Sequence, residues 1–169
     1  MPTIRQQLTL FVPESQSAEI EKVRKQFNPI QYGLIAAHVT LCREDEIVDL
    51  DVVMDNINRI ETKELSVSLG QATRFSEGKG VTLDGHGSNV AFHALRKEVL
   101  KGIIGQPRQH QPHITLMHPR NATCTDQMFE EIRQFKLPEV ITFDKISLIE
   151  QRDWGKWTTL KAFAISKRL

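Results

Sequence analysis

A tetrapeptide that occurs twice constrains this chain more than any other feature. His38-Val39-Thr40-Leu41 returns as His113-Ile114-Thr115-Leu116, about half a chain length later. The segments after the two copies are also similar: a stripe of apolar residues at helical spacing comes first, and alternating apolar residues typical of strands come next. We therefore expect two related halves, each with the order strand, helix, strand, strand.

Apolar periodicity places further elements around the two copies. One helix precedes each copy, at 15–28 and at 88–103, and Ser88 is the expected N-cap of the second. One helix comes after each copy, at 47–60 and in a segment opened by Thr125. The remaining predicted strands are 4–12, 65–69, 81–83, 141–149 and 157–165, with hairpin turns at 78–80 and at Gly155.

Strands in pairs with helices between them predict an α+β fold. We expect two pseudo-symmetric lobes around a central cleft, each an antiparallel or mixed sheet with helices on its outer face. The first strand, 4–12, would complete the N-terminal lobe. No linker or low-complexity tract divides the chain, so residues 1–169 are expected to form a single bilobal domain.

Charge and composition exclude several classes of function. The chain has 22 basic and 21 acidic residues, a formal net charge of +1, which argues against a sequence-independent grip on long duplex nucleic acid. Charged residues interrupt every apolar stretch, so no membrane span is expected. Cys42 and Cys124 lack CxxC spacing, which indicates reduced thiols in a cytoplasmic protein. We expect a monomer.

Each motif places an imidazole beside a hydroxyl. Residues two apart on a strand share a face, so His38 and Thr40 point one way, and His113 and Thr115 do the same in the other half. The apolar residues between them point into the core. A duplication that preserved only the fold could also leave this pattern, but it would not need to retain the polar residues.

The two motifs resemble the paired HxTx signatures of the 2H phosphoesterase superfamily, which includes the 2′,5′ RNA ligases and the 2′,3′-cyclic nucleotide phosphodiesterases. The resemblance covers essentially the whole chain and implies a bilobal fold, a cleft flanked by the two motif strands, and phosphodiester substrates. Relatives often carry a Tyr where the closing hairpin has Trp157. The RNA-ligase-like branch continues its first motif as HxTxxFLG, whereas this chain continues with Cys42-Arg43-Glu44. The branch and the substrate therefore stay open.

Two histidines suit the opening of a cyclic phosphate. Water must lose a proton to a base, the leaving ribose oxygen must gain one from an acid, and donors must hold the non-bridging oxygens. An unperturbed imidazole pKa of about 6.5 allows one histidine to be neutral while the other is protonated. Thr40 and Thr115 would hydrogen-bond the phosphoryl oxygens. The pattern does not decide which histidine is the base, and the chemistry requires no metal and no cofactor.

Four more residues are candidates for binding the substrate. Arg43 and Arg120 each lie some residues beyond a motif histidine, at the ends of the motif strands, and could steer the phosphate, although solvation at the surface explains them equally well. Trp154 and Trp157 could stack on a base, although core packing is the more frequent fate of such residues. His110, His113 and His118 match no common zinc spacing, so no metal site is expected.

The sequence thus predicts a metal-independent phosphodiesterase of the two-histidine type. Its expected substrates are 2′,3′-cyclic phosphates of nucleotides or RNA ends, or related 2′,5′ diesters. Three alternatives stay open: an ADP-ribose cyclic phosphate phosphodiesterase, a module that binds RNA ends without cleaving them, and a metal hydrolase.

Overall fold

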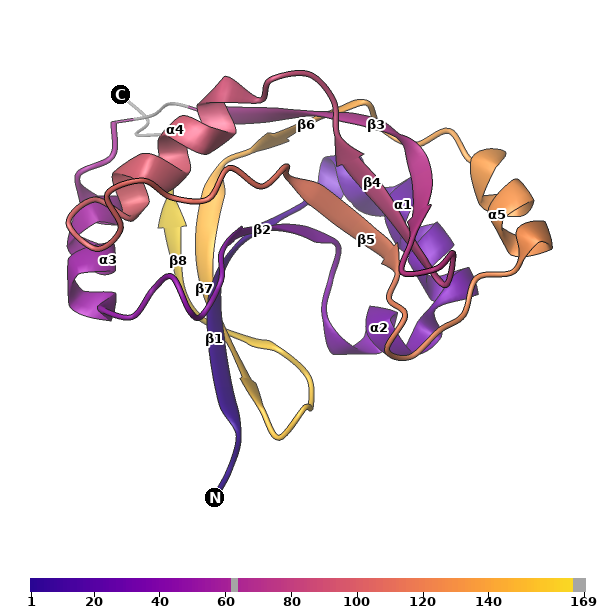
Figure 1. Ribbon diagram of the computed structural model, residues 1–169, viewed down its shortest axis with the longest axis horizontal. Helices are drawn as coiled ribbons and strands as arrows, with labels where there is room; N and C mark the ends of the chain where they lie inside the picture. Colours follow the sequence, from indigo (N-terminus) through magenta and orange to yellow (C-terminus); the bar gives the residue numbers. More distant parts are fainter. Residues whose placement is uncertain (62–63, 166–169) are drawn as a thin grey trace.

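The computed structural model describes residues 1–61 and 64–165 and consists of two four-stranded antiparallel sheets with helices packed against them (Figure 1). The elements in chain order are β1 (Ile4–Phe11), α1 (Glu14–Phe27), α2 (Pro29–Leu34), β2 (His38–Cys42), α3 (Leu50–Asn58), β3 (Leu65–Phe75), β4 (Gly80–Gly85), α4 (Val90–Val99), β5 (His113–Met117), α5 (Asp126–Arg133), β6 (Val140–Phe143), β7 (Lys145–Arg152) and β8 (Thr158–Ala164).

The two motif strands lie at equivalent places in the two sheets. The strand order is β2-β1-β7-β8 in the first sheet and β5-β4-β3-β6 in the second. β2 and β5 are therefore both edge strands, and they contact each other where the sheets meet (Figure 1). No strand ladder joins them among the described residues, so side chains must set their relative position.

The pairing of each motif strand repeats the same local geometry. Thr40 lies opposite Thr9 of β1, and Thr115 lies opposite Thr82 of β4. The register shifts immediately beyond each of these pairs, so both lobes carry an irregularity at the same point. Such a bulge bends a strand and redirects its side chains. The pseudo-symmetry expected from the repeat is confirmed at the level of register.

The lobes, however, are not the two halves of the chain. The strands that come after the first motif, β3 and β4, belong to the sheet of the second motif, and the hairpin of β7 and β8 closes the sheet of the first. β4 is thus the counterpart of β1. Apolar alternation identifies a strand but carries little information about its partner strands. The sequence therefore predicted these strands but not the sheet to which each belongs.

All four predicted helices are present, with two differences in detail. α1 and the N-cap of α5 are as expected, since the Thr125 side chain accepts a hydrogen bond from the Met128 amide. The N-cap of α4 is Asn89, not Ser88. Asn89 has a φ of +43° and its side chain bonds the backbone of Ser68 on β3, so this tertiary contact fixes where α4 begins. The short helix α2 was not predicted.

Both long helices bury an apolar stripe in one contiguous core. α1 packs against β5, and α4 packs against β3 and α3. The buried stripe residues are Ile20, Val23 and Phe27 of α1 and Phe92, Leu95 and Val99 of α4. Within the described ranges, no helix has the length and apolar character needed to cross a bilayer.

Candidate active site

A cavity of about 520 Å³ is lined by residues from both sheets. His38 and Thr40 reach it from β2, and His113 and Thr115 reach it from β5. The intervening residues of both motifs, Val39, Leu41, Ile114 and Leu116, are buried in the core. The period-two alternation of a strand therefore directs all four polar motif side chains into one space, as the sequence predicts.

Both imidazoles are oriented by the same local contact. The Nδ1 atom of His38 lies 2.9 Å from the Ala36 carbonyl oxygen, and that of His113 lies 3.3 Å from the Gln111 carbonyl oxygen. A carbonyl oxygen only accepts hydrogen bonds, so Nδ1 must carry the proton in each ring. Nε2 of each neutral ring is then left with its lone pair, which is the form that a general base requires.

His38 is held in its neutral form. Burial lowers its pKa from 6.5 to about 4, outweighing the hydrogen bond to Ala36, and the charges of Arg24 and His113 lower it further. Phe11 packs edge-on against the ring, with 6.2 Å between ring centroids. Arg24 is itself buried and lines the same cavity, so a fixed cation opposes protonation of His38.

Cationic side chains surround the motif residues. Four arginines line the cavity, against two carboxylates, and the six residues are Arg5, Arg24, Arg43, Arg120, Glu44 and Asp45. Arg5 forms an ion pair with Glu44, with Nε and Oε1 3.5 Å apart. The excess of guanidinium groups favours an anionic ligand, and the sequence candidates Arg43 and Arg120 are both among the lining residues.

The two tryptophans have different placements. Trp157 lines the cavity, whereas Trp154 stands in the turn between β7 and β8, with 56% of its surface exposed. The Arg5 guanidinium lies 5.3 Å from the Trp154 ring centroid and 5.5 Å from that of Trp157. Arg120 lies 5.7 Å from the Trp154 ring. The tryptophans therefore form a cation–π cluster with arginines from both lobes, next to the cavity.

The other histidines near the second motif do not come together as a ligand set. His118 lines the cavity, and burial, with a contribution from Arg120, lowers its pKa. His110 packs edge-on against Phe92, with 5.8 Å between ring centroids. Among residues 1–61 and 64–165, no group of three histidine, cysteine or acidic side chains is placed to hold a metal ion.

The sequence model that describes the 2′-5′ RNA ligase superfamily matches residues 12–154 of this chain, which include both motifs and the cavity residues between them. This chain belongs to the 2′-5′ RNA ligase superfamily. These proteins are the 2H phosphoesterases that the paired motifs indicate.

Several solved structures share the fold over nearly the full chain. Escherichia coli LigT complexed with ATP superposes with a TM-score of 0.65 at 18% identity, covering 96% of this chain and 98% of LigT. LigT complexed with 3′-AMP gives 0.64 at 18% identity, covering 99% and 100%. The protein TT0787 of Thermus thermophilus gives 0.52 at 18%, covering 96% and 98%. A search of curated protein sequences found no match.

Three charged residues near the superfamily motifs were missed in the sequence. Arg24 on α1 and Arg96 on α4 are each about 1% exposed, and Glu46 is 2% exposed. A signal for the arginines was present: each lies on the apolar stripe of its helix, in Ile20-Val23-Arg24-Phe27 and Phe92-Leu95-Arg96-Val99. A charge at the same point of two apolar stripes indicates a buried, partnered group on each helix.

Proposed function

We propose that this protein is a metal-independent phosphodiesterase that hydrolyses 2′,3′-cyclic phosphates of nucleotides or RNA ends, or related 2′,5′ diesters. One observation carries the proposal: two His-Thr pairs from different sheets line one arginine-rich cavity. Membership of the 2′-5′ RNA ligase superfamily supports a phosphoesterase. Residues 1–169 would act as one bilobal unit, because residues of both lobes are needed to build the site.

The neutral form of His38 assigns the roles of the two histidines in this proposal. His38, neutral and close to the buried Arg24, takes a proton from water through Nε2. The water oxygen forms a bond to phosphorus while the bond from phosphorus to one ribose oxygen breaks. His113 donates a proton to that leaving oxygen. In-line displacement places attacking and leaving oxygens on opposite sides of phosphorus, which suits imidazoles supplied by two facing strands.

Neutral and cationic donors stabilise the charge on the phosphoryl oxygens. The hydroxyls of Thr40 and Thr115 lie on the same strand faces as the imidazoles, where they can donate to the non-bridging oxygens. Arg43 and Arg120 supply positive charge, and they would also contact any further phosphate of the substrate. The imidazoles provide both proton transfers, so the scheme uses no metal ion.

A nucleotide substrate is favoured by two features. LigT has been crystallised with 3′-AMP, ATP and NADP+, so a protein with this fold accepts nucleotides. In this chain, Trp157 lines the cavity and Trp154 stands close by, and an aromatic face suits any base. A cytoplasmic monomer is also proposed, and the free thiols of Cys42 and Cys124 suit a reducing compartment.

The test is a panel of diesters incubated with the protein, with and without EDTA. The panel holds 2′,3′-cyclic nucleotides, ADP-ribose cyclic phosphate and 2′,5′-linked dinucleotides. We expect turnover of at least one substrate, unchanged by EDTA, and the position of the product phosphate identifies which ribose oxygen leaves. Binding without product would indicate an RNA-end-binding module, and inactivation by EDTA would indicate a metal hydrolase.

A further inference from the structure

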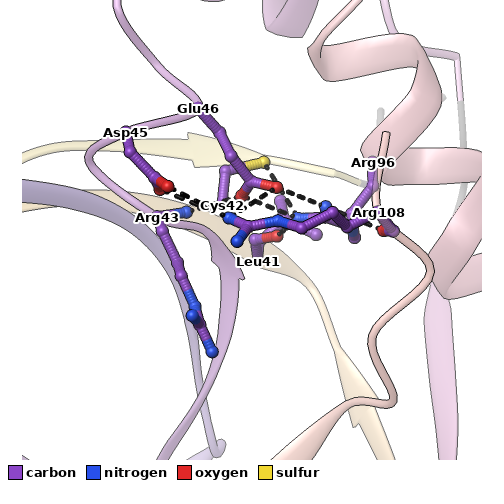
Figure 2. Close-up of polar contacts among 7 residues, drawn as sticks. All are labelled: Leu41, Cys42, Arg43, Asp45, Glu46, Arg96 and Arg108. Atoms are coloured by element: carbon purple, nitrogen blue, oxygen red, sulfur yellow. Dashed lines mark hydrogen bonds and ion pairs between the residues drawn. The ribbon is translucent and has the colours of Figure 1, made fainter. Parts of the chain in front are cut away.

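A buried ion pair contacts the end of β2 and the segment that precedes β5, and it takes no part in the chemistry described above. Arg96 of α4 and Glu46, in the loop after β2, are paired through two contacts, Nη2 to Oε1 at 2.6 Å and Nη1 to Oε2 at 3.1 Å (Figure 2). Burial opposes ionisation of Glu46, but the hydrogen bonds from Arg96 and the Arg43 amide, with the charges of Arg96 and Arg108, lower its pKa to about 2. Both groups are therefore charged inside the core.

The guanidinium also donates to backbone carbonyls of two segments that are far apart in the chain. Nη1 donates to the Leu41 carbonyl at 2.5 Å, and Leu41 directly follows Thr40 in the first motif. Nη2 donates to the Arg108 carbonyl at 3.1 Å, in the segment that leads into β5 and His113. Figure 2 shows Arg96 projecting from α4 between these two segments. One side chain thus ties the backbone of one motif strand to the approach of the other.

Glu46 holds the backbone of Arg43, whose side chain lines the cavity. Its Oε2 accepts a hydrogen bond from the Arg43 amide at 2.9 Å, and the Glu46 amide donates to the Arg43 carbonyl at 3.0 Å. These bonds fix the turn that ends β2. The Arg43 side chain points away from the ion pair (Figure 2) and is one of the residues that line the cavity.

Stability alone gives little reason for this pair. Removing two charges from water is costly, and replacing a buried ion pair by apolar residues of similar volume is often neutral or stabilising. The placement of the two motif strands gives a better reason for a buried ion pair here. β2 and β5 are edge strands of different sheets, so no backbone ladder sets their separation, and proton transfer to opposite sides of a phosphate depends on that separation.

We propose that the Arg96–Glu46 pair is a positioning device that sets the placement of His38 relative to His113. Neither Arg96 nor Glu46 lines the cavity, and both act through the backbone of Leu41, Arg43 and Arg108. A related set of contacts lies just before β2, where Arg24 donates to the Ile35 carbonyl and Glu21 accepts from the Ala37 amide, on either side of Ala36. The proposal rests on the proposed two-histidine function.

The experiment compares the double variant Arg96→Met/Glu46→Leu with wild type. Melting temperature, kcat and KM are measured on the best substrate of the panel. We expect an unchanged or higher Tm, a KM within about threefold and a kcat lowered by about 100-fold, the size of effect that a misplacement of about 1 Å produces. An unchanged kcat would overturn the proposal.

A control separates positioning from the general loss of an arginine that pairs with a carboxylate and holds backbone carbonyls. Arg74 likewise pairs with a carboxylate, Asp126, and donates to the carbonyls of Gly78 and Cys124, but it does not line the cavity. Arg74→Met/Asp126→Leu should keep the wild-type kcat. An equal fall of kcat in both double variants would indicate a merely structural role and would also overturn the proposal.

Two further measurements keep the test decisive. If Arg96→Met/Glu46→Leu fails to fold, Arg96→Lys replaces it, because an ammonium keeps the charge but cannot span both carbonyls and the carboxylate. The imidazole NMR signals of His38 and His113, assigned from the alanine variants, report placement without turnover. We expect both to shift in the Arg96 variants and neither in the Arg74 control. Unshifted signals contradict the positioning role, whereas an inactive wild type contradicts only the proposed function.

Discussion

His38 and His113 face one cavity from the edge strands of two different sheets, and each has Nδ1 directed at the carbonyl oxygen of the residue two positions earlier. The repeated contact gives both rings the same tautomer. Burial, and after it the charge of Arg24, favours the neutral form of His38. A nearly symmetric fold thereby directs two histidines from different sheets into one cavity and holds His38 neutral, as the base of an acid–base pair across a phosphate must be.

The assignment of His38 as the base predicts an unusual acid limb in the pH profile. kcat/KM reports groups of the free enzyme, and His38 must be neutral to accept a proton. Because its pKa is lowered to about 4, activity should persist as the pH falls below 6.5 and decline only as the pH approaches about 4. A profile of kcat/KM from acid to mildly alkaline pH tests this. Half-maximal activity near the ordinary imidazole pKa of about 6.5 on the acid side would contradict the assignment.

The threonine hydroxyls should matter for rate more than for stability. Thr40→Val and Thr115→Val keep the shape of the side chain and remove the donor, so we expect kcat to fall by about 10- to 100-fold, with little change in Tm. The matched controls Thr40→Ser and Thr115→Ser retain the hydroxyl and should retain most of the activity. Equal rates for the valine and serine variants would exclude a role for the hydroxyls.

Trp157 should contribute to substrate binding through its place in the cavity wall. Loss of one base-stacking contact costs about 1–3 kcal/mol, so Trp157→Ala should raise KM about tenfold or more. Trp154 lies outside the lining residues, and Trp154→Ala should have a smaller effect on a mononucleotide. Steady-state kinetics of both variants make the comparison. A larger KM effect from Trp154 would place the base at the turn between β7 and β8.

Glu46 should make the fold sensitive to acid. Its pKa is lowered from 4.5 to about 2, so the folded state binds fewer protons than the unfolded state in that window. The stabilisation is fully present above pH 4.5 and is lost as the pH falls towards 2. Thermal melts across and just above this window should show a steeper decline for wild type than for Glu46→Gln. Parallel curves would show that the carboxylate does not contribute in this way.

The motifs predicted the centre of the site because their information is local. Alternation on a strand decides where His38, Thr40, His113 and Thr115 point, and this needs no knowledge of the strand's partner. The alternation fails at the end of the strand. Cys42 has the same alternation phase as His38 and Thr40, yet it is fully buried, because the register shift opposite the end of β2 turns the last residue inward.

Long-range relationships were less accessible from the sequence. The placement of β3 and β4 in the second sheet depends on which edges pair, and the N-cap at Asn89 depends on a contact with Ser68. The Arg96–Glu46 pair joins residues far apart in the chain. Arg96 interrupts an apolar stripe, which signals a buried charge, but the partner is fixed only by the fold.

The central claim is that two imidazoles, one from each lobe, carry out the reaction together. The most direct measurement is turnover of the best panel substrate by His38→Ala and by His113→Ala, with His86→Ala as the control, since His86 lies outside the lining of this cavity. We predict that either motif variant abolishes turnover while its Tm stays near that of wild type, and that the control remains active. Wild-type turnover by His38→Ala or His113→Ala would contradict the two-histidine account.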